Sequence, residues 1–204
     1  MLEHELLLWD EGYRAIAGVD EVGRGCLFGD VVAAAVILPP GLVIEGVNDS
    51  KKLSEKKRDQ LYDIILRECI AWSAACVDAV TIDRINIKQS ARLAMKLAVE
   101  SLQTAPDFLL IDAEKVDVPV GQRSIIKGDA TSQSIAAASI VAKVTRDRLC
   151  SSVWERQYPS YGIAVHKGYA TKLHRERLIE HGPSPLHRKS FLGKLFPEEQ
   201  LVLF

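Results

Sequence analysis

The stretch "AGVDEVGRGCLFGD", residues 17–30, is the part of the chain that says most about the fold. An apolar run ends in two adjacent acids, Asp20 and Glu21, and the loop Gly23-Arg24-Gly25 follows at once. An apolar run without polar alternation is typical of a strand that is covered on both faces. We therefore expect a buried strand that brings two carboxylates and a glycine-rich loop to one end of a sheet.

The composition of the whole chain fits one globular domain. The 204 residues are 48% hydrophobic and 26% charged, and no apolar run reaches the 18 residues that a membrane span needs. The N-terminal stretch is acidic and has no basic region before a long apolar run, so we expect no export signal. The four scattered cysteines form no CxxC pair, which disfavours a zinc site and a disulfide framework. We expect a cytoplasmic monomer with a single domain over residues 1–204.

The charges are unevenly distributed, although the net charge is only −1. Residues 1–112 carry 18 acidic and 12 basic side chains, whereas residues 143–196 carry 4 acidic and 11 basic ones. An acidic site beside a basic flank suits a polyanionic substrate with metal ions, and a solvated charged surface is the other interpretation. On the first interpretation, residues 143–196 are a basic helical substrate-binding portion, and residues 197–204 are a flexible tail.

The order of expected elements indicates an α/β fold. We expect strands over residues 14–20, 31–38, 71–77 and 108–111, and helices from Ser54, over residues 83–102, after Asp129 and over residues 169–181. Asp129 is expected near the N-cap of the alanine-rich helix that contains "SIAAASIVAKVTRDRL". Strands come first and then alternate with helices, which predicts a mixed sheet with helices packed on it.

Four carboxylates share one feature, because each lies where an apolar element begins or ends. They are Asp20 and Glu21 after the first strand, Asp112 at the end of "DFLLID", and Asp129 before the alanine-rich helix. Strand ends are where side chains from distant parts of a sequence converge. Carboxylates brought together repel one another unless cations neutralise them, and Mg²⁺ takes such oxygen ligands. The pattern predicts a site for two ions roughly 3.5–4 Å apart, which stabilise the attacking and leaving oxygens of a phosphoryl displacement.

Two other interpretations of these acids stay open at this point. Adjacent residues on a regular strand point to opposite faces, so Asp20 and Glu21 can share a metal site only if the strand ends or bends near Val22-Gly23. Alternatively, the acids cap strand ends or pair with lysines.

The loop and the basic clusters also have two interpretations each. Gly23 and Gly25 serve either a tight turn or a close approach of the backbone to a ligand, with Arg24 beside a phosphate. Ser50, Lys51 and Lys52 precede a helix and either contact phosphate or form a solvated helix start. Lys143 has the spacing to pair with Asp147, and Tyr169 lies among bases, which suits stacking on a sugar or a base as well as an ordinary surface.

Five motifs together resemble the bacterial ribonuclease HII family. In order, they are AGVDEVGRG, NDSKKLSEKKRDQLY, DFLLIDA, KGD followed by SIAAASIVAKVTRDRL, and HKGYATKLH. The resemblance runs from about residue 16 to residue 191. It implies a ribonuclease-H-like fold, a mixed five-stranded sheet flanked by helices, with a C-terminal helical extension. It also implies hydrolysis of the RNA strand of RNA–DNA hybrids, with cuts 5′ of single ribonucleotides in duplex DNA that leave 3′-OH and 5′-phosphate ends.

The resemblance also implies roles for individual residues. Asp20, Glu21, Asp112 and Asp129 match the catalytic acids that hold Mg²⁺ or Mn²⁺. Gly23, Arg24 and Gly25 match the loop that reads the ribose 2′-OH at the RNA-to-DNA junction, and Tyr169 matches the tyrosine that stacks there. Ser50, Lys51, Lys52 and Lys143 match positions near the nucleic-acid backbone. The sequence departs from the family at Cys26, Phe28 and Asp30, where a proline, a small residue and a second proline are usual.

One feature lies outside this resemblance. The chain ends in Gln200-Leu201-Val202-Leu203-Phe204, which looks like the short peptide with which bacterial proteins bind the replication sliding clamp. The other interpretation is a tail that packs on its own domain. Two further functions are alternatives to the hybrid nuclease, namely another metal-dependent nuclease of the same fold and a non-catalytic nucleic-acid-binding module.

Overall fold

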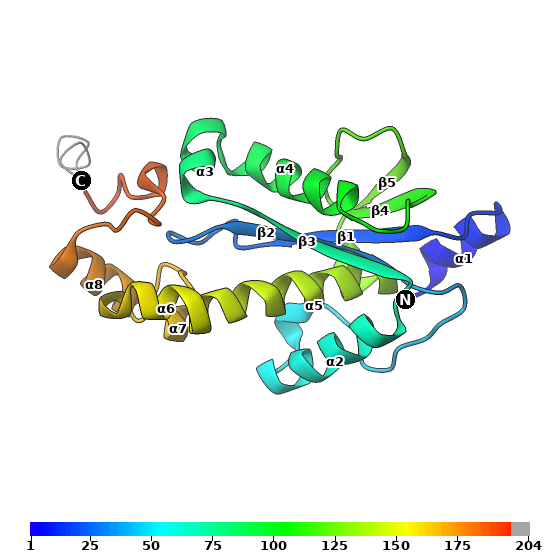
Figure 1. The fold of residues 1–204 in the computed structure, drawn as a ribbon, viewed down its shortest axis with the longest axis horizontal. Helices are drawn as coiled ribbons and strands as arrows, with labels where there is room; N and C mark the ends of the chain where they lie inside the picture. Colours follow the sequence, from blue (N-terminus) through cyan, green and yellow to red (C-terminus); the bar gives the residue numbers. More distant parts are fainter. Residues whose placement is uncertain (197–204) are drawn as a thin grey trace.

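A five-stranded mixed sheet lies between two layers of helices in the computed structural model, which describes residues 1–196 (Figure 1). The strands are β1 (Ile16–Val22), β2 (Val31–Ile37), β3 (Ala71–Val77), β4 (Phe108–Asp112) and β5 (Gly121–Ile125). Their order in the sheet is β3-β2-β1-β4-β5, with β1, β4 and β5 parallel and β2 antiparallel to β1 and β3. The sequence-based expectation of a mixed sheet of five strands flanked by helices is confirmed.

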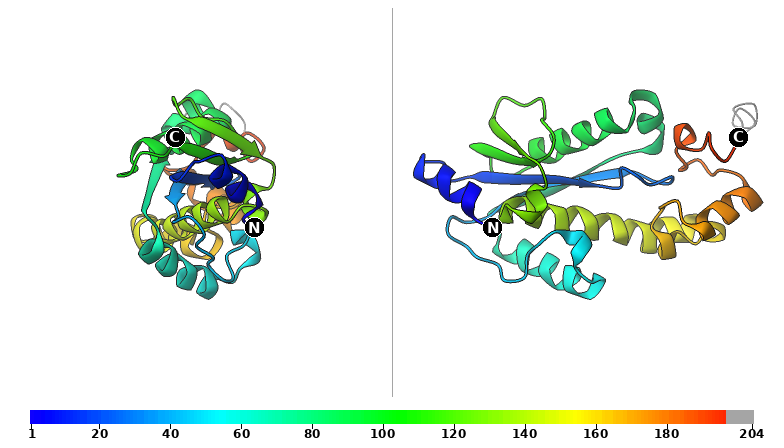
Figure 2. Two further views of the ribbon diagram at one scale, coloured as in Figure 1. Left: turned by 90° about the vertical axis from the view of Figure 1, so that its right-hand side faces the viewer. Right: turned by 180° about the vertical axis from the view of Figure 1, so that it is seen from behind.

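The helices cover the two faces of the sheet unequally. They are α1 (Glu3–Asp10), α2 (Glu55–Glu68), α3 (Ala79–Ile85), α4 (Ile87–Glu100), α5 (Gln133–Arg148), α6 (Glu155–Gln157), α7 (Ile163–His166) and α8 (Lys172–His181). On one face, α4 packs against the apolar side chains of β1 and β2 that include Ala17 and Val19. On the other face, α5 packs on β1 and β2, and α2 packs outside α5 (Figures 1 and 2). No helix within residues 1–196 is long and apolar enough to cross a membrane.

The C-terminal helices form a second, smaller cluster at one end of the molecule. A π-helical turn (Leu149–Trp154) continues α5, and α6, α7 and α8 then fold back beside the loop that follows β1. Phe28 of that loop is fully buried against Trp154 and His187, with ring centroids 5.8 and 4.8 Å away. The loop after β1 is thus part of the core that joins the sheet to the C-terminal helices.

Several expected boundaries were wrong. The first strand is Ile16–Val22 rather than 14–20, and the last helix begins at Lys172, where the Thr171 side chain caps it. The helix expected over residues 83–102 is two helices, because Asn86 has a φ of 67° and its side chain caps the second one at Gln89. Asp129 does not cap α5. The N-cap is Ser132, and Asp129 lies in the preceding 3₁₀ turn, Gly128–Ala130.

Candidate active site

Asp20 and Glu21 lie on opposite faces of β1. Asp20 pairs with Ala34 in the register of β1 and β2, and Glu21 pairs with Ala33, so the strand stays regular to Val22. Ala34 belongs to the core under α5, whereas Ala33 belongs to the core under α4. β1 does end at Val22, but it is still regular at Glu21, so its end does not bring the Asp20 and Glu21 side chains to one face.

The end of β4 explains how one acid, Asp112, interacts with acids on both faces of β1. The parallel pairing of β1 with β4 stops at Val19 and Ile111, so β1 extends past its neighbour. Asp112, the last residue of β4, interacts electrostatically with both Asp20 and Glu21. The carboxylates are thus arranged around the open edge of β1 where β4 ends.

Asp129 reaches the same edge through the turn before α5. The backbone N–H of Gly128 donates to Asp112 Oδ1 at 2.7 Å, which fixes this turn to the end of β4. A hollow of about 450 Å³ opens here, and its lining includes Asp112, Asp129, Lys51 and Lys127. Because Asp112 interacts electrostatically with Asp20, Glu21 and Asp129, the four acids lie in one region of the molecule.

The electrostatics of this region disfavour negative charge. Burial, with the neighbouring charges of Glu21 and Asp112, raises the pKa of Asp20 well above its ordinary value. Burial also raises the pKa of Glu21 despite the nearby Arg24 guanidinium. Burial and the charge of Asp49 raise the pKa of Asp129. Each shift means that added positive charge would stabilise these carboxylates.

Two cations of the chain itself lie against the acids. Lys51 Nζ lies 3.7 Å from Asp129 Oδ2, and Arg24 Nη1 lies 3.2 Å from Glu21 Oε1. Glu114, a buried acid that the sequence analysis did not single out, accepts from the same Arg24 nitrogen at 3.3 Å and from Arg92 of α4 at 2.9 Å. Within residues 1–196, no three acidic, histidine or cysteine side chains lie close enough together to hold one metal ion.

The donor chemistry nevertheless fits a hard divalent cation. The groups around the edge are carboxylate oxygens, which Mg²⁺ and Mn²⁺ prefer over nitrogen or sulfur ligands. Glu21 Oε2 is buried and has no hydrogen-bond partner among the described residues. A buried carboxylate oxygen without a partner is costly, and a metal ion would satisfy it.

The loop after β1 carries Arg24 and Gly25 beside the acids. Gly23 has a φ of 93°, which only glycine adopts without strain, whereas Gly25 is exposed and has no atom within 4 Å of where a Cβ would stand. An isolated bridge pairs Cys26 with Tyr169, which places the tyrosine next to this loop. The Tyr169 side chain is partly exposed, and Lys143 Nζ lies 5.8 Å from its ring centroid.

Two of the three residues that depart from the family pattern, Cys26 and Phe28, are fully buried. Phe28 is packed in the C-terminal cluster, and Cys26 is buried with its thiol donating to the Lys167 carbonyl at 3.6 Å. The carbonyl of Asp30 accepts from Arg146 Nε at 3.0 Å. The Cys26 and Phe28 side chains therefore add no bulk on the exposed side of Gly25.

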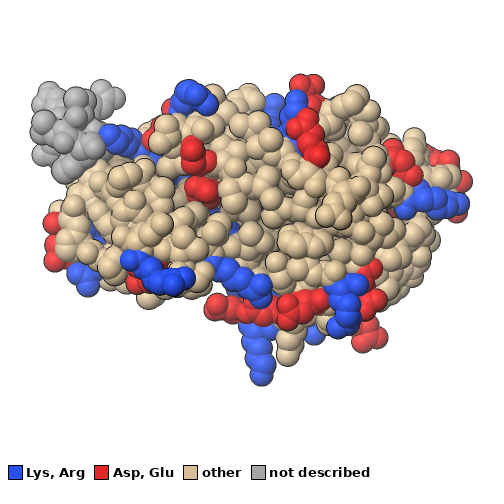
Figure 3. Space-filling model, in the orientation of Figure 1, with Lys and Arg blue, Asp and Glu red and all other residues tan. Residues whose placement is uncertain are grey.

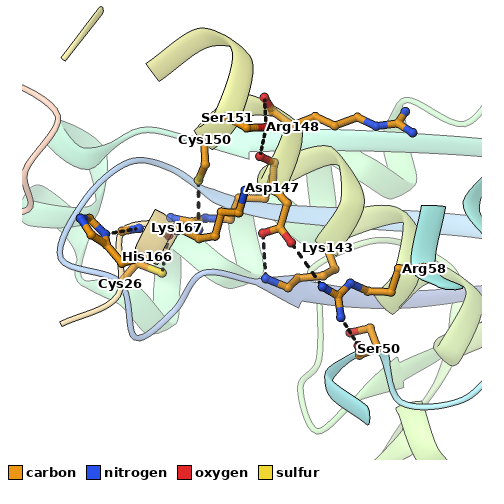
Figure 4. Close-up of polar contacts among 12 residues, drawn as sticks. Cys26, Ser50, Arg58, Lys143, Asp147, Arg148, Cys150, Ser151, His166 and Lys167 are labelled. Atoms are coloured by element: carbon orange, nitrogen blue, oxygen red, sulfur yellow. Dashed lines mark hydrogen bonds and ion pairs between the residues drawn. The ribbon is translucent and has the colours of Figure 1, made fainter. Parts of the chain in front are cut away.

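The remaining expected substrate contacts are not equally exposed. Lys51 and Lys52 are exposed, whereas Ser50 is buried and its hydroxyl lies 2.9 Å from Ser139 Oγ of α5. Lys143 donates to Asp147 at 2.7 Å, so the pairing left open by the spacing does occur (Figure 4). Arg58 joins the same acid at 3.8 Å and also donates to the Ser50 carbonyl.

The surface charges do not form one basic patch on the face of Figure 3. Lysine and arginine alternate there with aspartate and glutamate along the lower edge, and most of the face is uncharged. Exposed side chains of opposite charge also pair with each other, as Arg148 does with Asp59 and Lys172 with Glu176.

A five-stranded mixed sheet flanked by helices, with acids around the ends of β1 and β4, has the architecture of the ribonuclease-H-like class of proteins. The family model described as "Ribonuclease HII" matches residues 17–194. A ribonuclease HII from Alkaliphilus metalliredigens is 60% identical over 200 residues, which cover 95% of this chain and 98% of that protein. The chain belongs to the ribonuclease HII family and is an endonuclease.

Solved structures share the fold. The ribonuclease H2 of Pyrococcus horikoshii superposes with a TM-score of 0.75 at 24% identity, covering 92% of this chain and 98% of that one. The ribonuclease HII of Archaeoglobus fulgidus, solved as a complex with PCNA, superposes with a TM-score of 0.68 at 25% identity, covering 85% and 93%.

Proposed function

We propose that this chain hydrolyses the RNA strand of RNA–DNA hybrids and cuts 5′ of single ribonucleotides in duplex DNA, leaving 3′-OH and 5′-phosphate ends. The observation that carries the proposal is the ion pair between Arg24 and Glu21 at 3.2 Å. It joins the glycine-rich loop to the acid cluster, so that recognition of the ribose and cleavage next to it occur in one place. The family membership of the chain supports the same activity.

In this proposal, Gly25 lets the loop backbone approach the ribose 2′-OH, because a side chain there would stand between them. Arg24 contacts the adjacent phosphate, and Tyr169 stacks on the neighbouring sugar or base. Lys51, Lys52 and Lys143 lie near the nucleic-acid backbone. Ser50 acts from the interior, through its contact with Ser139.

Asp20, Glu21, Asp112 and Asp129 are the residues that would hold two Mg²⁺ or Mn²⁺ ions. Bound there, such ions supply an activated water and stabilise the leaving oxygen. The chain's own contribution is to orient the carboxylates. The Gly128 N–H fixes Asp112, and burial of Asp20 under α5 excludes competing water.

Asp20→Asn and Asp112→Asn test the catalytic assignment. Each variant should bind the substrate and fail to cut it, because an amide cannot replace the carboxylate charge. Cleavage of a duplex with one embedded ribonucleotide, of all-DNA duplex and of branched DNA is measured with Mg²⁺, with Mn²⁺ and with EDTA. Cutting of branched or all-DNA substrates would indicate another nuclease of the same fold. Binding without any cutting by the wild type would indicate a non-catalytic module.

We further propose that Gln200, Leu201, Leu203 and Phe204 bind a replication sliding clamp. These residues lie outside the part of the chain that the structure describes, and the support is their sequence and the PCNA complex of the archaeal relative. Deletion of residues 200–204 should abolish clamp binding and leave cleavage of a short duplex unchanged. An unchanged clamp affinity would contradict the proposal.

A further inference from the structure

Two fully buried arginines, Arg146 of α5 and Arg188 after α8, lie under the loop of residues 23–30. Neither belongs to any of the ion pairs found within residues 1–196. Their guanidinium groups bond instead to backbone carbonyls of the loop and its neighbour. The charge of Asp30 acts on both arginines, but no carboxylate oxygen of the described residues lies within 4.0 Å of either guanidinium. Burying a charge without such an ion pair is costly, so this arrangement calls for an explanation beyond stability.

Arg188 binds both ends of the loop. Its Nη1 donates to the carbonyls of Gly23 at 2.7 Å and Arg24 at 3.1 Å, and its Nε donates to the carbonyl of Gly29 at 2.9 Å. Its backbone N–H donates to the Leu27 carbonyl at 2.8 Å. The planar fork of one guanidinium thus fixes the distance between the start and the end of the loop.

Arg146 holds the same loop from α5. Its Nη2 donates to the Phe28 carbonyl at 2.9 Å, and its Nε donates to the Asp30 carbonyl. Its Nη1 donates to the Lys167 carbonyl at 2.7 Å, next to the segment that carries Tyr169. Figure 4 shows Lys167 beside Cys26 at this end of α5. Arg146 therefore sets the loop and the tyrosine segment relative to each other.

Both arginines bind the loop by its carbonyl groups. No hydrogen bond among the described residues uses the backbone N–H of Arg24 or of Gly25. A Cβ at Gly23 would stand 2.4 Å from Arg146 Nε, so the loop rests directly on that side chain. With the carbonyls turned toward the buried guanidiniums, the N–H groups at residues 24 and 25 remain available to a ligand.

We propose that Arg146 and Arg188 are positioning residues that hold the loop of residues 23–30 in the shape that selects the RNA-to-DNA junction. The inference rests on the proposed function, because it assigns the junction reading to this loop. The arginines touch no substrate in this account. They act by fixing where the Arg24 and Gly25 backbone and the Tyr169 ring lie.

The test uses Arg188→Lys and Arg146→Lys in the full chain. Each keeps a positive charge, but a single ammonium cannot reproduce the fork that binds several carbonyls. The substrate is a duplex in which one strand carries four consecutive ribonucleotides between stretches of DNA, cut with Mg²⁺. The measured quantity is the ratio of cuts at the junction to cuts at internal ribonucleotides. We expect this ratio to fall at least fivefold in both variants.

The cut ratio separates positioning from stability, because a partly unfolded sample makes fewer cuts without moving them. Ile65→Ala is the matched control, since Ile65 is buried between α2 and α5 and touches neither arginine nor the loop. It should lower the melting temperature and keep the wild-type ratio. Lysine variants that keep the wild-type ratio would overturn the inference. A wild-type enzyme that cuts all ribonucleotides equally would overturn the junction reading itself, whatever the arginines do.

Discussion

Gly18 of β1 lies so close to Ser134 of α5 that a Cβ at residue 18 would stand 2.0 Å from the Ser134 carbonyl carbon. The contact is between two backbones, so no flexible side chain can move aside. Because α5 rests directly on β1, the Ser139 side chain further along the helix comes close enough to Asp20 to lower the pKa of its carboxyl. The position of Asp20, one of the proposed catalytic acids, thus depends on the absence of a side chain at residue 18.

Gly18→Ala should therefore destabilise the protein by at least about 2 kcal/mol, since overpacking against backbone forces the helix to shift. Urea unfolding measures the change. Gly193→Ala is the control, because a Cβ there has no atom within 4 Å. Equal stability of the two variants would show that α5 can move away from β1 at little cost.

Gly25→Ala should separate recognition from folding. Residue 25 has no positive φ and no neighbour within 4 Å of an added Cβ, so the free energy of unfolding should change by less than about 1 kcal/mol. Cleavage of the single-ribonucleotide duplex should fall at least tenfold, because the new methyl group faces the ribose. The same Gly193→Ala variant should cut normally. Full activity of Gly25→Ala would show that the loop does not recognise the ribose.

The local pattern of the sequence predicted the apolar strands and the acids near their ends. It did not predict a strand that lacks an apolar run, or a helix break across which the helical periodicity continues. β5 reads "GQRSI", and only Ile125 is buried, so no apolar run marks it. The break at Asn86 is invisible because helical periodicity continues on both sides. The partners of Arg188 lie 159–165 residues away in the sequence, and no local signal reports such contacts.

Asp20→Asn should make the protein more stable while it abolishes cleavage. Asp20 is buried, and the raised pKa of its carboxyl reflects burial and the charge of Glu21. An amide of the same shape removes that repulsion, so the free energy of unfolding at pH 7 should rise by about 1 kcal/mol in EDTA. Asp63→Asn, at an exposed position on α2, should change neither quantity. A destabilised Asp20→Asn variant would contradict this account of the site.

A chain of neutral histidines supports the segment that carries Tyr169. The Ser184 N–H donates to His187 Nδ1 at 2.9 Å, so the hydrogen of His187 is on Nε2, which lies 3.0 Å from His174 Nε2. His174 then donates from Nδ1 to the Tyr169 carbonyl at 2.9 Å. The remaining nitrogen of each ring accepts a hydrogen bond, so a second proton on that nitrogen would break the chain of hydrogen bonds. Burial lowers the pKa of His174 to about 4, and burial together with the neighbouring His174 lowers the pKa of His187 to about 3.

These lowered pKa values make stability depend on pH. Histidines of the unfolded chain titrate near pH 6.5. Between about pH 4 and pH 6.5, His174 and His187 are therefore protonated in the unfolded chain and neutral in the folded one. The stabilisation is complete above pH 6.5 and is lost as the pH falls, with a slope that approaches about 1.4 kcal/mol per pH unit for each histidine. The carboxyls of Asp20 and Asp129, whose pKa values are raised, contribute a slope of the opposite sign.

The difference in stability between wild type and His187→Gln isolates the contribution of this histidine. Urea unfolding from pH 4.5 to 7 should show a shallower loss for His187→Gln, while His181→Gln, at an exposed position, should follow the wild type. Parallel curves for wild type and His187→Gln would mean that His187 is charged in the folded protein.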